Sequence, residues 1–287
     1  MRPLRAERPS EERPRIGELN VCGIAGYSLS GASRVDQTLA TQTLLAAISE
    51  RGSDAVGYAH RGTGRPTAVH KQRGGASALL DGLEVPGDAI QALIHVRDYT
   101  KGHPSLTANN HPIRHGAVVG IHNGIIANDE EILADHGFER AEPGMTVDSE
   151  AIFALADDAS SRPGALEELH GSMAAAWLDD RAEETLFLAR GIGRPLCIGE
   201  GRDELFFAST RKALELVERY TGVRLRKRAH GEGTFLADAD GAVRRTDSYE
   251  PDQSFVEGEV LPPVRAPEEG RSALARLAAI ATPVIAR

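Results

Sequence analysis

A cysteine followed by small and apolar residues near the start of the chain limits the possible folds and chemistries more than any other feature. Cys22 opens the run Cys-Gly-Ile-Ala-Gly-Tyr at 22–27, which has the character of a buried strand. A cysteine in such a run is often only a packing residue. If its thiol is instead a nucleophile that uses its own α-amino group as the base, Cys22 must be the first residue, because a peptide nitrogen has no usable lone pair. The 21 residues before Cys22 would then mask it.

Five further motifs follow Cys22 in a fixed order, and each alone would be weak evidence. They are Arg51-Gly52-Ser53-Asp54 with Gly57, His95-Val96-Arg97-Asp98-Tyr99-Thr100-Lys101-Gly102, Asn110-His111-Pro112, Gly120-Ile121-His122-Asn123-Gly124-Ile125-Ile126, and Val147-Asp148-Ser149-Glu150. Together they resemble the class II glutamine amidotransferase domain, an N-terminal-nucleophile hydrolase of the kind that begins glucosamine-6-phosphate synthase. The resemblance runs from Cys22 to about Asp240.

The expected fold class is α+β. Hydrophobic periodicity predicts strands at 22–27, 57–60, 67–72, 92–97, 173–178, 185–189, 196–198 and 205–208. It predicts helices at 36–49, 128–136, 148–159 and 210–220, the middle two beginning at the N-cap residues Asn128 and Asp148. This order is compatible with two packed sheets covered by helices. The resemblance implies a four-layer α/β/β/α sandwich of the N-terminal-nucleophile hydrolase type.

Composition divides the chain into three parts. Residues 1–21 carry five arginines among prolines and glutamates without apolar periodicity, and are expected to be a disordered extension or propeptide. Residues 22–240 form the predicted amidotransferase domain. Residues 241–287 form a proline-containing tail, whose Ala/Leu-rich segment at 272–281 is predicted either as a frayed helix or as an amphipathic helix that docks onto a partner.

Two routes could free the amino group of Cys22. One is proteolytic or autocatalytic removal of residues 1–21, so that the segment acts as a propeptide. The other is a mis-annotated start, because Val21 can be encoded by the bacterial start codon GTG and Gly17-Glu18 can be encoded by a ribosome-binding sequence. We predict the second route, which requires GTG at Val21.

The resemblance implies a role for each residue of a catalytic centre. Cys22 would attack the side-chain amide of glutamine, its α-amine would move the proton, and water would hydrolyse the resulting thioester. Asn123, through its side-chain N–H, and Gly124, through its backbone N–H, would stabilise the oxyanion. Asn-Gly is also the preferred dipeptide of hairpin turns, which is the structural alternative.

Glutamine binding is expected to need a cation for the α-carboxylate and an anion for the α-ammonium group. The resemblance assigns these roles to Arg97 and Asp148, although Asp148 could alternatively only cap a helix. Thr100 and Gly102 would line the same pocket, and Arg51 and Asp54 would brace the nucleophile from behind. We call residues 97–102 the glutamine loop; Asp98, Tyr99 and Lys101 stand in it where glucosamine-6-phosphate synthases usually carry Trp, Ala and His.

Composition narrows the other function classes. The net charge is −9 and no basic stripe is interleaved with aromatic residues, so nucleic-acid binding is not expected. No apolar run reaches the length of about 18 residues that a membrane span needs, and no signal peptide is apparent, which predicts a cytoplasmic protein. The histidine spacings predict no metal site, and no cofactor is expected.

The expected function is therefore a stand-alone glutaminase that hydrolyses L-glutamine to glutamate and ammonia. After Asp240 little room remains for an acceptor domain, so the ammonia is expected to pass to a separate synthase subunit. Two alternatives stay open. The chain could be a γ-glutamyl amidohydrolase that acts on a larger γ-glutamyl amide, or a catalytically silent module that binds glutamine.

Overall fold

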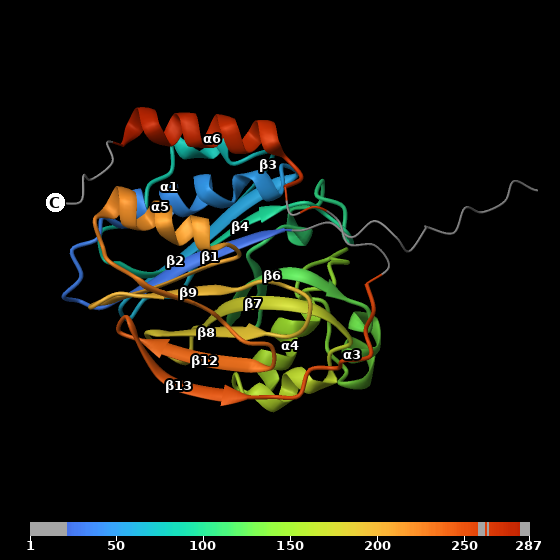
Figure 1. Cartoon of the computed structure of the whole chain (residues 1–287). Helices are drawn as coiled ribbons and strands as arrows, with labels where there is room; N and C mark the ends of the chain where they lie inside the picture. Colours follow the sequence, from blue (N-terminus) through green and yellow to red (C-terminus); the bar gives the residue numbers. More distant parts are fainter. Residues whose placement is uncertain (1–21, 258–261, 263, 282–287) are drawn as a thin grey trace, which may run out of the picture.

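Two antiparallel sheets pack face to face and are each covered by helices on the outside (Figure 1). The computed structural model describes residues 22–257, 262 and 264–281, so the predicted extension at 1–21 lies outside the described residues. The predicted four-layer α/β/β/α sandwich is confirmed.

The first sheet, within the described residues, has seven strands in the order β11-β9-β10-β1-β4-β2-β3. Their bounds are Arg226–Ala229 (β11), Cys197–Glu200 (β9), Glu204–Ala208 (β10), Gly23–Leu29 (β1), Ala89–Arg97 (β4), Ala55–Gly62 (β2) and Ala68–Arg73 (β3).

The second sheet has six strands in that part of the chain, in the order β13-β12-β8-β7-β6-β5. Their bounds are Ala242–Ser248 (β13), Thr234–Ala239 (β12), Thr185–Arg190 (β8), Gly171–Asp179 (β7), Val118–Ile126 (β6) and Ile113–His115 (β5).

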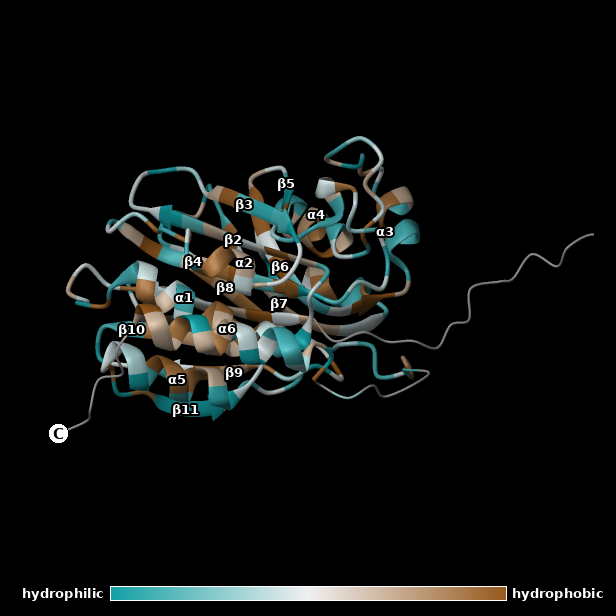
Figure 2. Cartoon of the chain, turned by 90° about the horizontal axis from the view of Figure 1, so that it is seen from above, coloured by the Kyte–Doolittle hydropathy of each residue, from teal (hydrophilic) through white to brown (hydrophobic). Residues whose placement is uncertain are grey.

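The helices fall into two groups. Helices α1 (Gln37–Ile48), α2 (Ser77–Leu80), α5 (Arg211–Thr221) and α6 (Pro267–Ile280) cover the first sheet, as Figure 2 shows from above, while α3 (Asp129–Asp135) and α4 (Glu150–Asp158) lie on the second (Figure 1). Short 3-10 turns lie at Ser49–Arg51, Thr107–Asn109 and Pro163–Glu168. None of the helices in the described ranges has both the length and the apolar character that a bilayer crossing requires.

Three hydrophobic clusters match the three spaces between four layers. One joins α1, α5 and α6 to the first sheet, and a second joins α4 to the second sheet around the buried Trp177. The third lies between the sheets and includes Ile24, Leu93, Val119 and Ile121. Because side chains alternate along a strand, residues two positions further along these strands also face the space between the sheets.

The predicted helix starts are only partly correct. Asp36 caps α1, since its Oδ1 accepts a hydrogen bond from the Leu39 N–H at 2.8 Å. The cap predicted at Asp148 is wrong, because the N-cap residue of α4 is Ser149. Asn128 is the N-cap residue of α3, as predicted, but its side chain does not bond the first turn of the helix. The Asn128 amide bonds the Glu168 carbonyl and the His170 N–H instead, which ties α3 to the segment before β7.

Two elements extend the ordered fold past the boundary predicted at residue 240. Strand β13 pairs with β12 through a turn at Asp240–Gly241, so it completes the second sheet. Helix α6 packs on α1, and its Ala273 and Leu277 are both fully buried. The helix predicted at 272–281 therefore docks onto the chain's own first layer.

We expect Leu277→Ala to lower the free energy of unfolding by about 2–4 kcal/mol, because the substitution leaves a cavity in the core under α6. Ile280→Ala on the same helix, where the side chain is 45% exposed, should change it by less than about 0.5 kcal/mol. Urea unfolding of both variants measures the difference. Equal, small effects would mean that α6 is not part of the cooperative fold.

Candidate active site

The register of β1 on β4 places Cys22 beside Arg97. Gly23 lies opposite Val96 in this antiparallel pair. Cys22, which precedes Gly23, is therefore level with Arg97, which follows Val96. Cys22 is two residues before Ile24, and Arg97 is four residues after Leu93, so both face the space between the sheets. The strand order therefore brings the predicted nucleophile and the predicted carboxylate-binding residue together.

The Cys22 thiol is held at the edge of the first sheet. Its Sγ–H donates to the Asp98 carbonyl at 3.4 Å, and its own carbonyl accepts from Nε of the buried Arg51 at 2.9 Å. Burial raises the pKa of the thiol to about 11, against a smaller opposing effect of the hydrogen bond and of the Arg97 charge. The thiol is thus almost fully protonated near neutral pH and needs a base to become a nucleophile.

Arg97 is only 2% exposed, and the glutamine loop wraps around its guanidinium group. Nη1 donates to Asn110 Oδ1 at 2.6 Å, and Nη2 donates to the carbonyls of Lys101 and Gly102. These bonds use three of the five N–H donors of the guanidinium group, including both of Nη2. The Nε–H and the second N–H of Nη1 lie on different edges of the planar group, so Arg97 offers an anion its buried positive charge and single donors, not a parallel pair.

The remaining predicted residues of the first sheet support the same loop. Asp54 Oδ2 accepts from the Tyr99 N–H at 2.9 Å, and the Asp54 N–H donates to the Arg97 carbonyl at 3.0 Å. Thr100 is half-buried in the loop, and Gly102 closes it with a φ of 78°, where a side chain would also meet Asn109. Arg51 thus holds Cys22, the predicted nucleophile, and Asp54 holds the loop.

Asn123 and Gly124 lie near the end of β6, on the sheet opposite Cys22. Asn123 is fully buried, and both polar atoms of its side chain lack a hydrogen-bond partner among the described residues. Because Val119 and Ile121 face the other sheet, Asn123 faces it too. Gly124 has a φ of 146°, and a Cβ there would lie 1.9 Å from the Ser172 carbonyl oxygen, so only glycine fits. The Asn-Gly pair is therefore within a strand and not in a hairpin turn.

A hydrogen bond between two histidine-bearing strands aligns the sheets at this end. His95 Nε2 on β4 lies 3.1 Å from the His122 carbonyl oxygen on β6. Since a carbonyl only accepts, Nε2 carries the proton and donates it. The His122 ring points to the other face of β6, where Nδ1 lies 2.9 Å from Ser149 Oγ. The strand of Asn123 is thereby tied both to the strand of Arg97 and to the segment that contains Asp148.

Asp148 is nearly fully buried just before α4. Its Oδ2 accepts from the Ile126 N–H of β6 at 2.8 Å. Burial raises the pKa of its carboxyl group, while this hydrogen bond and the charges of Lys101 and Arg97 oppose the rise. Asp148 also acts electrostatically on the Cys22 thiol, so Cys22, Arg97 and Asp148 share one electrostatic environment.

Sequence reasoning gave no role to three buried histidines of the site. The rings of His95 and His111 stack with centroids 4.2 Å apart, and burial lowers the pKa values of His95 and His122 to about 3 and that of His111 well below its usual range. All three rings are therefore neutral; those of His95 and His122 make hydrogen bonds, whereas both ring nitrogens of His111 lack a partner among the described residues. All three stand inside the motifs that carried the resemblance, but spacing alone does not show which side chains stack.

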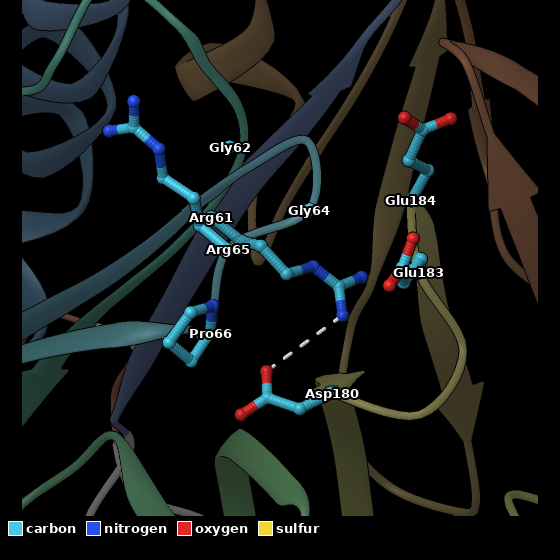
Figure 3. A pocket seen from close by; sticks show the side chains of 8 residues that line it. All are labelled: Arg61, Gly62, Gly64, Arg65, Pro66, Asp180, Glu183 and Glu184. Atoms are coloured by element: carbon cyan, nitrogen blue, oxygen red, sulfur yellow. Dashed lines mark ion pairs between the residues drawn. The ribbon is translucent and has the colours of Figure 1, made fainter.

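Within the described ranges, no group of three or more His, Cys, Asp or Glu side chains is arranged to hold a metal ion. A separate pocket of about 240 Å³ lies at the opposite end of the first sheet, since Gly62 at its rim pairs with Ala89 whereas Ala55 pairs with Arg97 (Figure 3). Its Arg61 bonds the Gln91 side chain and two backbone carbonyls, which is a structural bridge between the sheets.

The fold and this constellation define a class of protein, the glutamine amidotransferases. Residues 97–216 match the family model of the glutamine amidotransferase domain. The chain belongs to the class II glutamine amidotransferase family, whose members are enzymes with the N-terminal-nucleophile hydrolase fold.

Its relatives include the isomerizing glutamine–fructose-6-phosphate aminotransferases of Listeria innocua and Bradyrhizobium diazoefficiens, which are 32% and 30% identical over 204 and 207 residues. Each alignment covers 68% of this chain and 32% of the relative, so the chain spans about a third of their length. Among solved structures, the glutamine phosphoribosylpyrophosphate amidotransferase of B. subtilis, complexed with ADP and GMP, superposes with a TM-score of 0.64 at 20% identity. That match covers 79% of this chain and 49% of the other, and it shows the fold alone.

The raised thiol pKa makes a prediction for the chain in which Cys22 is still peptide-linked. The shift from 9.0 to about 11 lowers the thiolate fraction about a hundredfold at neutral pH, and the greater nucleophilicity of the more basic thiolate recovers about tenfold. Iodoacetamide should therefore alkylate Cys22 about tenfold more slowly in the folded chain than in the same chain in urea. Peptide mass mapping between pH 7 and 10.5 separates Cys22 from Cys197. A rate that levels off at or below pH 9 in the folded chain would contradict the shift.

Proposed function

We propose that this chain hydrolyses L-glutamine to glutamate and ammonia through a thioester on Cys22. The observation that carries the proposal is the fully buried Asn123 amide, which has no hydrogen-bond partner in the part of the chain that the structure describes and faces the same space between the sheets as Cys22. A buried amide without partners is costly for folding, so its presence favours a function for it. An oxyanion that forms only during reaction is a suitable partner.

The reaction follows from the groups already described. The free α-amine of Cys22, with a usual pKa near 7.7, takes the thiol proton, and Sγ forms a bond to the side-chain carbonyl carbon of glutamine. The carbonyl electron pair moves to oxygen, where the Asn123 side-chain N–H and the Gly124 backbone N–H stabilise it. The oxyanion then collapses, the C–N bond breaks, and the leaving nitrogen takes the proton back from the amine. Water hydrolyses the thioester, which releases glutamate and restores the thiol.

The substrate's amino-acid end is held by opposite charges. The guanidinium group of Arg97 binds the α-carboxylate, and Asp148 binds the α-ammonium group. Both side chains are buried, so each gains more from a charged partner than an exposed residue would. Thr100 and Gly102 complete the wall of the pocket. These contacts reach only the α-carboxylate and α-ammonium groups, which all γ-glutamyl amides share. Whether the chain prefers glutamine or a larger γ-glutamyl amide therefore depends on how the site accepts the group bound to the side-chain nitrogen.

The ammonia that the reaction releases needs an acceptor. The curated relatives are named as aminotransferases to fructose 6-phosphate, and this chain aligns with about a third of their length. We propose that its ammonia also serves an acceptor enzyme, and a separate synthase subunit stays a prediction. Co-purification from the native host, followed by assays with glutamine in place of ammonia, would test this.

The first test of the proposal concerns the two cysteines. A chain that begins at Cys22 should release glutamate from L-glutamine, and Cys22→Ala should reduce the rate by more than about a thousandfold, because the nucleophile is gone. Cys197→Ser is the matched control and should keep the activity, since Cys197 packs against the helical layer. Activity that survives in Cys22→Ala would refute the thioester. Cleavage of bulky γ-glutamyl amides but not of glutamine would instead favour the amidohydrolase.

The second test concerns the oxyanion. Asn123→Ala should lower kcat by about 10²–10³-fold with little change in KM, because the lost donor acts only on the charge that develops in the transition state. Asn128→Ala removes an amide that bonds the backbone near α3, and should leave both constants within about twofold. A change confined to KM in Asn123→Ala would assign Asn123 to substrate binding.

A further inference from the structure

Ion pairs hold the glutamine loop from opposite sides of the molecule. Lys101 Nζ lies 2.8 Å from both carboxylate oxygens of Asp129, the first residue of α3, and 3.1 Å from Oε1 of the exposed Glu130. Asp98 Oδ2 lies 3.0 Å from Nε of Arg265, which precedes α6. Helix α3 covers the second sheet and α6 covers the first (Figure 1), so the loop is bridged between the two outer layers.

The Lys101 pair has the geometry of a fixed contact. The Asp129 side chain is only 2% exposed, whereas that of Lys101 is 38% exposed. Arg140 is the other cation near Asp129, at 3.6 Å, and it also binds Glu150 at 3.1 Å and the Val147 carbonyl. A buried carboxylate needs a close cation, so Asp129 favours the loop conformation that brings Lys101 to it.

The Arg265 pair connects the loop to the nucleophile. The backbone N–H groups of Arg265 and Ala266 both donate to the Glu50 carbonyl at 2.9 Å, which fixes the segment before α6 next to Arg51. The carboxylate of Asp98 bonds Arg265, and the carbonyl of the same residue accepts from the Cys22 thiol. Asp98 therefore contacts both Arg265 and the Cys22 thiol, so a shift of Arg265 would move the carbonyl to which Sγ–H donates.

Building on the proposed function, we propose that Lys101 and Arg265 are positioning residues that hold the glutamine loop around its substrate, Lys101 through Asp129 and Arg265 through Asp98. Neither cation touches the reacting atoms. Their loss weakens glutamine binding because the bound loop conformation becomes one of several.

Lys101 has a second effect that Arg265 lacks. The charged groups that act on Asp148 are Lys101 and Arg97, while Asp129 and the Cys22 thiol lie in the same environment. Without the Lys101 charge, Asp148 binds a proton at higher pH and loses the form that holds an ammonium group. The fall of kcat/KM at low pH should therefore occur at higher pH when Lys101 is replaced and stay unchanged when Arg265 is replaced.

The experiment uses the chain that begins at Cys22, which keeps all three hydrophobic clusters, since their residues lie between Ile24 and Ala281. We expect Lys101→Met and Arg265→Met to raise KM for glutamine about 5- to 20-fold with kcat within about threefold. Lys101→Arg and Arg265→Lys should restore most of the affinity. Lys227→Met is the control. It removes the ion pair between Lys227 on β11 and Glu218 on α5 and should change neither kcat nor KM.

Hydrogen exchange of the amides at 99–102 gives a readout that does not depend on activity. Exchange should become faster in both Met variants and stay unchanged in Lys227→Met. Lys101→Met removes the closest cation of the buried Asp129 carboxylate, which can impair folding. The double variant Lys101→Met with Asp129→Asn removes both charges of the pair and should show the same faster loop exchange. The acid limb of kcat/KM should move to higher pH in Lys101→Met but not in Arg265→Met.

The outcomes are distinguishable. If the parent chain hydrolyses glutamine but KM and loop exchange are unchanged in both variants, the positioning proposal is overturned and the glutaminase stands. If only one variant has an effect, the residue replaced in the other variant does not position the glutamine loop. If the parent chain does not hydrolyse glutamine, the proposed function fails, and loop exchange alone decides whether the ion pairs order residues 97–102.

Discussion

The contact on which the site depends most is the hydrogen bond from His95 on β4 to the His122 carbonyl on β6. Apolar side chains fill the space between the sheets, but they are non-directional and would tolerate a sliding of one sheet over the other. A hydrogen bond with a fixed donor does not. Because His95 is two residues before Arg97 and His122 precedes Asn123, this single contact fixes the strand of Arg97 relative to the strand of Asn123.

Neutral imidazoles suit this position better than charged groups would. Burial lowers the pKa of His95 to about 3 and that of His111 well below its usual range, so their stack adds no positive charge beside Arg97. Arg97 consequently keeps its attraction for a carboxylate. The Nδ1 atom of His95 and both ring nitrogens of His111 lack partners among the described residues, which costs stability that the packed sheets must offset. The same cost at Asn123 indicates that this end of the layer is polar for a functional reason.

Sequence reasoning predicted the layers of the fold well and the contacts of the site less well. Strands such as β1 and β4 are readable because their apolar residues are continuous, and the motif order implied the sandwich. Strands β11 and β13 lie at sheet edges, and their charged residues, such as Arg226 and Arg244, hide the strand pattern. The cap predicted at Asp148 was wrong because propensity describes the nearest turn, while its carboxylate bonds Ile126 on another element. The catalytic roles of Cys22, Asn123 and Gly124 stay predictions that the geometry makes specific.

The site combines parts with different sensitivity to their surroundings. Strand register fixes Cys22, Arg97 and Asn123, and a slip by one residue would turn each away from the space between the sheets, so these positions are all-or-none. The glutamine loop instead depends on ion pairs, and the lysine of one of them is partly exposed, so the strength of that pair varies with salt and with small displacements. The strands and the loop are thus held by different kinds of interaction. A change at Asp98 or Lys101 would therefore alter the elements to which the loop is attached and leave the strand register intact.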